Sequence, residues 1–316
     1  MAVGRSSTAW KGSGKRSARG TDMYEQYYSL KERPFSLTPD PDFLFLSESH
    51  QRALDHLLFG LESGDGFIVV TGDIGVGKTT VCRALLRRLP ERFATALVVN
   101  TLVTEKELLR TVLEDFGVTV PDGTRKDLLD ALNRFLRFHL LAEAEIGRRP
   151  VLIIDEAQNL APQLLEQVRL LSNLETEKRK LLQIVLFGQM ELQEKLRLPQ
   201  LRQFDQRITV RTTILPLDRR ETSRYIQHRM SVAGASGSAF LSPAAERLLH
   251  RRSRGVPRRI NQLCDRALLA ACVRNAARVE REDVVRAAES LFGGPKGVGW
   301  AAWPWRWFRP GRGGAA

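Results

Sequence analysis

The segment GDIGVGKT, residues 72–79, has the spacing of glycine, lysine and threonine that is typical of a phosphate-binding loop. Its glycines let successive backbone N–H groups turn inward around a triphosphate, and the following helix adds partial positive charge at its N-terminus. Lys78 would reach the β- and γ-phosphates, and the Thr79 hydroxyl would bind Mg²⁺. The alternative is a glycine turn without a ligand. We expect the nucleotide to be held by Gly72, Asp73, Ile74, Gly75, Val76, Gly77, Lys78, Thr79 and Thr80.

A second segment, VLIIDE at residues 151–156, is an apolar run that ends in two carboxylates. A buried strand here would present Asp155 at its C-terminal tip, where it binds Mg²⁺ directly or through water. Glu156, one residue further, can polarise a water molecule toward the γ-phosphate. Either carboxylate could also be a plain polar strand end. Because a kinase needs an acceptor pocket instead, the pair points to hydrolysis.

Three further polar positions could take part in the chemistry. Gln189 follows the apolar run LLQIVLFG, and its amide could bond the γ-phosphate or the attacking water. Arg202 and Arg207 precede the last predicted strand, where an arginine can reach the nucleotide of a neighbouring subunit. We favour Arg207 for this role; the alternative is a surface ion pair. Arg258 opens a helix after Gly255 and would point back at the phosphates, although the arginines at 251–259 could be only a solvated basic face.

The elements that must position these residues alternate between strands and helices up to residue 217. The predicted strands are continuous apolar runs, which is typical of a parallel sheet covered on both faces. Thr104 and Glu107 form a capping box for one of the helices between them. We therefore predict an α/β fold with a five-stranded parallel sheet, whose strands lie at 66–71, 94–100, 151–156, 181–188 and 207–215.

No strand pattern follows Pro216. Asp218 with Glu221, and Ser242 before Pro243, are start signals for helices. The sequence predicts a small all-helical domain with helices at about 218–233, 242–254, 257–277 and 281–291.

The net charge of +13 is concentrated at the ends of the chain. Residues 1–20 carry five basic and no acidic side chains, and residues 293–316 carry four basic and no acidic ones, which leaves +4 between them. A DNA-binding face that covers the whole domain is therefore not favoured. We expect four parts: a disordered basic head at 1–22, a nucleotide-binding domain at 23–217, a helical lid domain at 218–292 and a Trp/Arg-rich tail at 293–316.

Other classes of protein are disfavoured by what the sequence lacks. The three cysteines are too few for a disulfide framework and have no metal spacing, so we expect reduced thiols in the cytosol. His50 and His56 would not share a helix face, which argues against a metal site. There is no signal-peptide pattern and no run of about 18 apolar residues that could span a bilayer.

In this order, the motifs resemble those of an AAA+ ATPase of the origin-recognition-like branch. More closely, MYEQYYSLKERPFSLTPDPDFLFLSESHQRAL (residues 23–54), GDIGVGKTT, IIDEAQNL, IVLFGQMEL, FDQRI and GVPRRIN are similar to the secretion ATPases of the GspA/ExeA type and to their pilus- and exosortase-linked relatives. The likeness covers residues 23–292. It implies ATP as the nucleotide, a lid domain, and assembly into a homo-oligomer such as a ring, at the inner face of the bacterial cytoplasmic membrane.

Carried over by position, the resemblance implies roles for the residues already singled out. It assigns nucleotide binding and hydrolysis to the glycine loop with Lys78 and Thr79, and to Asp155 and Glu156. Gln189 matches the first sensor, Arg207 the arginine finger and Arg258 the second sensor. The type II secretion members continue past the lid into a membrane span and a peptidoglycan-binding region, and we expect no peptidoglycan role from the 24 residues after Phe292.

The last 20 residues have a composition of their own, with Trp300, Trp303, Trp305 and Trp307 beside Arg306 and Arg309. Tryptophan and basic residues favour the interface of an anionic membrane. Docking on a partner protein and a tail without a role are the alternatives.

The sequence thus predicts a Mg²⁺-dependent ATPase that works as an assembly factor for a bacterial envelope system such as secretion, pilus or exopolysaccharide export. It would be cytoplasmic and peripheral to the membrane, with an envelope protein as partner. The alternatives are a DNA-associated AAA+ ATPase of the initiator or transposition-helper type, and a scaffold that binds ATP with little hydrolysis.

Overall fold

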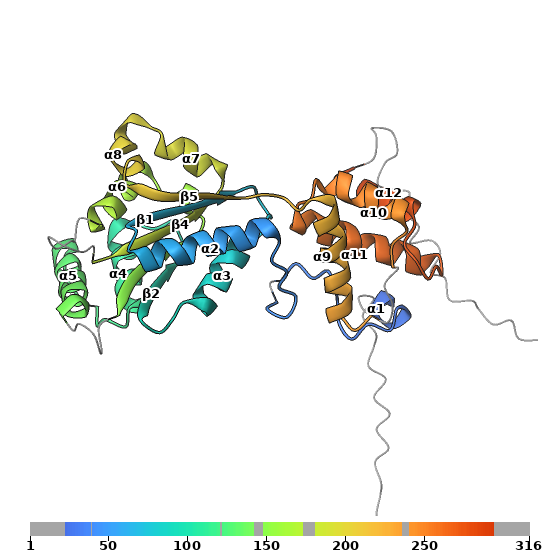
Figure 1. The fold of residues 1–316 in the computed structure, drawn as a ribbon, viewed down its shortest axis with the longest axis horizontal. Helices are drawn as coiled ribbons and strands as arrows, with labels where there is room; N and C mark the ends of the chain where they lie inside the picture. Colours follow the sequence, from blue (N-terminus) through green and yellow to red (C-terminus); the bar gives the residue numbers. More distant parts are fainter. Residues whose placement is uncertain are drawn as a thin grey trace, which may run out of the picture.

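The computed structural model describes residues 23–38, 40–120, 122–141, 148–172, 181–235 and 240–293. The predicted basic head and Trp/Arg-rich tail lie outside these residues. An α/β unit is followed by a helical unit, and the two lie side by side along the long axis of the molecule (Figure 1). No helix in the described ranges is both long enough and apolar enough to cross a bilayer.

Five parallel strands form the sheet, as predicted. Their order is β2-β3-β4-β1-β5, so β1 lies between β4 and β5 near one edge of the sheet. The order places the carboxyl ends of β1, β3 and β4 together at one end of the sheet. The strands are β1 (Phe67–Gly72), β2 (Phe93–Val98), β3 (Arg149–Ile154), β4 (Gln183–Gly188) and β5 (Ile208–Ile214).

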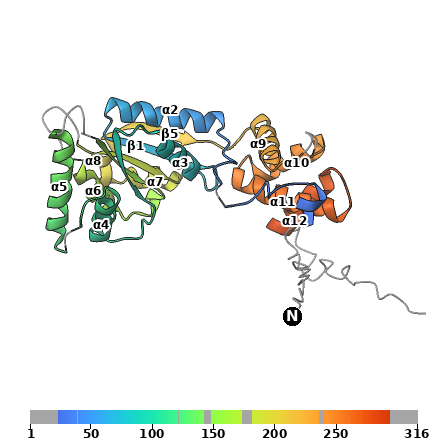
Figure 2. The ribbon, with the colours of Figure 1, turned by 90° about the horizontal axis from the view of Figure 1, so that it is seen from below.

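Helices cover both faces of the sheet, because alternate strand residues are apolar on each side. Ile68 and Val70 of β1 pack with α2 (Glu48–Ser63) and α3 (Lys78–Arg88). Phe67 and Val69 face a separate core on the other side, so α2 and α4 lie on opposite sides of the sheet (Figure 2). The helices of that second face are α4 (Glu105–Asp115), α5 (Arg125–Leu141), α6 (Pro162–Leu171) and α7 (Met190–Leu196).

Short elements join the larger ones. They are η1 (Ala157–Asn159), η2 (Pro199–Leu201) and α8 (Arg202–Asp205). The predicted capping box at Thr104 and Glu107 begins α4 and is confirmed.

The helical unit has a core of its own, built by α9 (Arg219–Val232), α10 (Pro243–Ser253), α11 (Pro257–Val273) and α12 (Arg281–Phe292). Its predicted starts are confirmed: Asp218 and Glu221 form a capping box, and Ser242 caps α10. The boundaries assigned to the domains stay predictions. We call residues 218–292 the lid.

Residues 23–46, including α1 (Met23–Tyr27), form an N-terminal strap that packs on the lid before the chain enters α2 (Figure 1). The Tyr24 hydroxyl donates to Asp265 at 2.6 Å, and the Tyr28 hydroxyl donates to the carbonyl of Ala276 at 3.0 Å. Tyr24 and Phe35 are buried in the lid core. The strap therefore belongs structurally with the helices of the lid.

Candidate functional site

The glycine-rich loop joins β1 to α3, which is the strand–loop–helix setting that its sequence predicts. Gly75 and Gly77 have φ of +81° and +105°, in the region that side chains rarely adopt. A Cβ at Gly77 would also lie 2.7 Å from Nε2 of His50. Glycine is therefore required at this position by both conformation and space.

Lys78 opens α3 with its side chain folded back over the loop. The ammonium group donates to the carbonyls of Gly72 and Asp73 at 2.9 and 3.0 Å. Burial lowers the pKa of Lys78, while the negative charges of Glu156 and Asp155 act in the opposite direction. The ammonium thus lies inside the loop, facing the carboxylates expected to do the chemistry.

Thr79 and Asp155 meet as predicted. The Thr79 hydroxyl donates to Oδ2 of Asp155 at 2.9 Å, and the Asp155 side chain is buried. Two oxygen donors of this kind, next to a phosphate-binding loop, are the ligands that Mg²⁺ prefers, with waters and phosphate oxygens completing its shell. The residues present therefore fit a Mg²⁺–nucleotide complex.

The strand that was predicted to extend to Glu156 ends at Ile154, two residues earlier. Glu156 is in the left-handed region with φ +52°, which a strand cannot contain, and its N–H is bonded to Oδ1 of Asp155 at 2.9 Å. This turn lifts the Glu156 side chain out of the sheet. Its Oε2 accepts from the Gln158 amide at 2.6 Å and from the Gln189 amide at 3.4 Å. The structure therefore brings Glu156 and Gln189 together.

Arg207 lies at the other end of the sheet. It immediately precedes β5, whose first residue, Ile208, is aligned with the first residue of β1, and its guanidinium donates to Ser172 Oγ at 3.2 Å. At about 3.3 Å per residue, the length of β1 separates it from the glycine loop. Arg207 is therefore far from the glycine loop of its own chain. Arg202 is exposed on α8.

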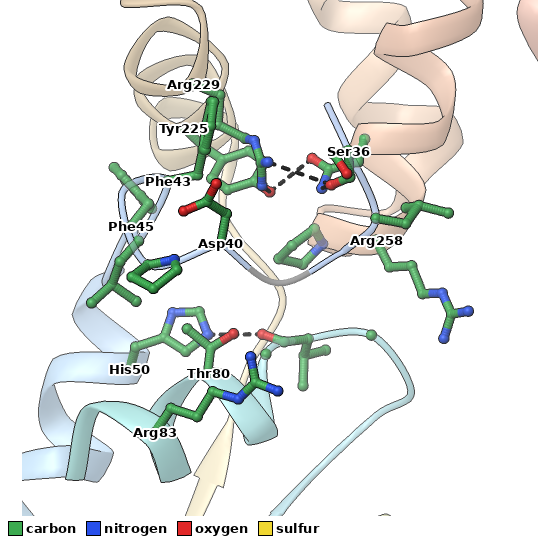
Figure 3. A pocket seen from close by; sticks show the side chains of 18 of the residues that line it. Ser36, Asp40, Phe43, Phe45, His50, Thr80, Arg83, Tyr225, Arg229 and Arg258 are labelled. Atoms are coloured by element: carbon green, nitrogen blue, oxygen red, sulfur yellow. Dashed lines mark hydrogen bonds between the residues drawn. The ribbon is translucent and has the colours of Figure 1, made fainter. Parts of the chain in front are cut away.

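Arg258, by contrast, lies beside the glycine loop. Its backbone N–H donates to the carbonyl of Gly75 at 3.3 Å, and a Cβ at Gly75 would lie 2.7 Å from the Arg258 Cβ. The guanidinium is exposed next to the loop (Figure 3). The first turn of α11 therefore holds an arginine where it was predicted to be.

A pocket of about 200 Å³ lies between the glycine loop, the strap and the lid. Figure 3 shows Phe43 and Phe45 of the strap and Tyr225 of the lid on one side, with Thr80 and Arg83 of α3 on the other. An aromatic-lined pocket next to a phosphate-binding loop fits the base and sugar of a nucleotide. The sequence did not predict this aromatic wall.

Arg229 joins the strap to the lid. Its buried guanidinium donates to the carbonyl of Pro34, to that of Ser36 at 3.4 Å and to the Tyr225 hydroxyl at 3.0 Å. It also lies 4.6 Å from the centre of the Phe43 ring. These contacts shape the pocket, and no motif in the sequence predicts them.

His50 is the second residue that sequence reasoning missed. Its Nδ1 accepts from the Ser47 N–H at 3.2 Å, which leaves Nε2 to donate to the carbonyl of Val76 in the glycine loop at 2.8 Å. Burial lowers the pKa of His50, so the neutral ring is favoured. The first turn of α2 thus holds the glycine loop through this hydrogen bond. The only signal in the sequence was the pattern S-x-x-H at a helix start.

Comparison with known proteins agrees with this geometry. A family model described as an AAA domain matches residues 61–196. Over 271 residues, or 86% of this chain, the sequence is 46% identical to the general secretion pathway protein A of Aeromonas hydrophila. The chain belongs to the GspA-like AAA+ proteins. It spans 49% of the length of that curated relative.

Solved structures support the fold of this GspA-like chain. The ADP form of the ORC2 protein from Aeropyrum pernix matches with a TM-score of 0.60 and 16% identity, covering 82% of this chain and 73% of that one. CDC6P from Pyrobaculum aerophilum matches with a TM-score of 0.64 and 18% identity, covering 83% and 71%. The predicted P-loop α/β fold with a helical C-terminal part is therefore confirmed.

Proposed function

We propose that this GspA-like chain binds ATP with Mg²⁺ and hydrolyses it to drive assembly of a bacterial envelope system. The observation that carries the proposal is the meeting of three motifs at one end of the sheet. Thr79 bonds Asp155, Gln189 bonds Glu156, and the negative charges of both carboxylates act on the ammonium of Lys78 in the glycine loop.

Each residue has a definable part in the reaction. Lys78 exchanges its contacts with loop carbonyls for the β- and γ-phosphates, and Thr79 and Asp155 hold Mg²⁺, which neutralises phosphate charge. Oε1 of Glu156 accepts no hydrogen bond within the described residues, so it is available to a water molecule near the γ-phosphate. Gln189 and Arg258 contact the γ-phosphate from the sheet and from the lid.

The test is ATP turnover by the full chain. Glu156→Gln keeps the size of the side chain but removes its basicity, so we expect ATP affinity to persist while hydrolysis falls about 100-fold or more. Glu166→Gln, in an ion pair on α6, is the matched control and should turn over ATP normally. Equal turnover by Glu156→Gln and the wild type would refute the assignment.

The position of Arg207 favours an oligomer. Arg207 lies at the opposite end of the sheet from the glycine loop of its own chain, so as an arginine finger it would reach the nucleotide of a neighbouring subunit. We expect Arg207→Ala to bind ATP and to lose hydrolysis by about 10³-fold, the scale of arginine fingers. Turnover per subunit of the wild type should rise with protein concentration. Arg202→Ala distinguishes the two candidate arginines, and a larger loss in that variant would reverse their roles.

The envelope role rests on the 46% identity to the general secretion pathway protein A of Aeromonas hydrophila. A cytoplasmic protein at the inner face of the membrane would meet an envelope partner there. The Trp/Arg-rich tail would add affinity for anionic lipid. Co-flotation with anionic liposomes that is lost on deletion of residues 297–316 would support this attachment, and unchanged flotation would exclude it.

The charge of the lid favours a second candidate function, an ATPase that acts on nucleic acid. Residues 218–292 contain 15 arginines, no lysine and 8 acidic residues, a net charge of +7, whereas residues 21–217 have 25 basic and 28 acidic residues, a net charge of −3. Many of the lid arginines are exposed and form no ion pair with described residues: Arg219, Arg220, Arg224, Arg247, Arg251, Arg252, Arg254, Arg258, Arg259, Arg266, Arg281 and Arg286.

Salt distinguishes the two candidates. Binding of duplex DNA by a chain without both tails, with a steep fall as salt rises, would favour the nucleic-acid function. Absence of such binding, together with attachment to anionic liposomes, would favour the envelope function.

A further inference from the structure

Gln158, two residues after Glu156, bridges two parts of the site. Its side-chain N–H group donates to Oε2 of Glu156 at 2.6 Å, and its side-chain oxygen accepts from the backbone N–H of Gln189 at 3.0 Å. One amide thus joins the carboxylate that follows β3 to the backbone at the end of β4. These strands are hydrogen-bonded neighbours in the sheet.

The surroundings of Gln158 leave its side chain little freedom. Lys195 of α7 donates to the backbone carbonyl of Gln158 and to that of Leu160, the latter at 2.8 Å, and so fixes the turn that carries the glutamine. A Cβ on Gly188 would lie 3.2 Å from the Gln158 side-chain oxygen and 2.6 Å from Cδ2 of Leu192. The glutamine therefore occupies a slot whose walls are β4 and α7.

Glu156 needs such support because its own backbone does not restrain it. A glutamate side chain has about 1.5–2 kcal/mol of rotamer freedom, and Glu156 lies beyond the end of β3 with its backbone in the left-handed region. Both amide donors reach the same oxygen, Oε2, so they fix the plane of the carboxylate and leave Oε1 directed elsewhere. The Gln189 contact is the longer of the two, at 3.4 Å against 2.6 Å for Gln158.

We propose that Gln158 is a positioning residue for the hydrolytic base: it holds Oε2 of Glu156 so that Oε1 meets the attacking water, and it ties that orientation to the position of Gln189. This inference rests on the proposed function, because it assigns a task in ATP hydrolysis. It concerns the rate of the chemical step. The binding of ATP is assigned to the glycine loop, which follows β1 and not β3.

The decisive variant is Gln158→Met, which keeps the length of the side chain and removes the bonds to Glu156 and Gln189, together with a longer one of 3.5 Å to the side-chain oxygen of Asn159. A base that is misplaced by about 1 Å loses about 100-fold in rate, so we expect kcat to fall about 10- to 100-fold. The KM for ATP should stay within about twofold, because no contact to the nucleotide is removed. A purely structural role predicts instead a parallel loss of ATP affinity and folding stability.

A double variant tests whether Gln158 acts through Glu156. When Glu156 is already glutamine there is no base to position, so Gln158→Met should add little to the loss seen in Glu156→Gln. Single-turnover rates make this comparison when steady-state turnover is slow. A further tenfold loss in the double variant would overturn the proposal.

Gln183 offers a matched control at the start of β4, at the opposite end of that strand from Gln189. Its amide also makes two bonds, to the carbonyls of Leu61 at 3.1 Å and Asp65 at 3.0 Å. Gln183→Met should lower the unfolding midpoint and leave kcat unchanged. A fall in kcat as large as that of Gln158→Met would show that the loss of any glutamine amide that bonds the sheet region has this effect, and would overturn the inference.

The outcomes distinguish a failure of the positioning role of Gln158 from a failure of the proposed ATPase function. If the wild-type chain does not hydrolyse ATP, or Glu156→Gln hydrolyses it normally, the proposed function fails. If Glu156→Gln is inactive and Gln158→Met retains full kcat, the function stands and the positioning role fails. The function and the positioning role are both supported by three results together. The kcat falls in Gln158→Met but not in Gln183→Met, the KM for ATP stays constant, and the double variant loses no more activity than Glu156→Gln.

Discussion

The candidate site has two sides that are built in different ways: a sheet wall, formed by the glycine loop and the strand ends beside it, and a lid wall, formed by the strap and the lid. On the sheet side, polar groups meet at the ends of neighbouring strands and are already bonded to one another, as in the contacts of Lys78 and of Thr79 with Asp155. On the lid side, the wall combines the strap with α9 and α11, and its key bond joins Arg229 to Pro34, 195 residues away. The sheet wall is thus formed by short motifs that are local in the sequence, whereas the lid wall depends on packing between segments that are distant in the sequence.

The largest expected effect is a loss of ATP affinity when a residue of the sheet wall is replaced. Lys78→Ala removes the only side-chain ammonium among the described loop residues, and a charge-assisted contact to phosphate in a partly buried site is strong. We expect ATP affinity to fall at least 100-fold, measured by titration calorimetry, with little change in the unfolding midpoint. Lys106→Ala on the exposed face of α4 is the control, and retained affinity in Lys78→Ala would remove the loop from nucleotide binding.

A smaller effect, and one of a different kind, is expected from the lid wall. Arg229→Ala leaves the carbonyls of Pro34 and Ser36 without their charged donor, and we expect about 2–4 kcal/mol less stability in urea unfolding. ATP affinity should fall only as the strap loosens. Arg224→Ala, exposed on the same helix, should change stability by less than about 0.5 kcal/mol. Similar losses in both variants would contradict the assigned role of Arg229.

The smallest expected effect concerns the contact of His50 with the loop and depends on pH. Because burial lowers the pKa of His50 in the folded protein, the unfolded chain binds a proton more readily, at its ordinary pKa of about 6.5. Stability should therefore be constant above that pH and fall as pH decreases below it, with the carboxylate of Glu221 partly opposing the loss.

Unfolding midpoints between pH 8 and 5 measure this dependence. His50→Gln cannot titrate and should show a flatter profile in this range. His56→Gln is exposed on the same helix and should keep the profile of the wild type. An identical profile for His50→Gln would exclude His50 as the source.

The sequence predicted the strands of the sheet and the loop between β1 and α3 because their signals are local. The glycine spacing, the apolar strands and the capping pairs each lie within a few residues. The turn at Glu156 was not visible, because apolar periodicity does not report the side-chain bond from Asp155 that ends the strand early. The predicted helix at 257–277 likewise ends at Val273, before Asn275 adopts a positive φ.

The lid wall could not be predicted in the same way. His50 and Arg229 have partners 26 and 195 residues distant, and a single sequence contains no record of such pairings. Gln158 is adjacent to a recognised motif, but its function depends on β4, which is placed beside β3 only in the folded chain. The roles of Gln189, Arg207 and Arg258 remain predictions, for which the structure supplies positions.

The route of the strap has a mechanical consequence. The lid is connected to the sheet unit by two chain crossings, one through residues 36–47 and one through residues 215–218 (Figure 1). They are joined side by side, because the Leu215 N–H donates to Ser49 Oγ at 2.7 Å and the Glu48 N–H donates to Glu221 at 2.9 Å. Both crossings are therefore bonded to the first turn of α2, the helix whose His50 donates to the carbonyl of Val76 in the glycine loop. A displacement of the lid relative to the sheet unit would be transmitted through these bonds to the glycine loop.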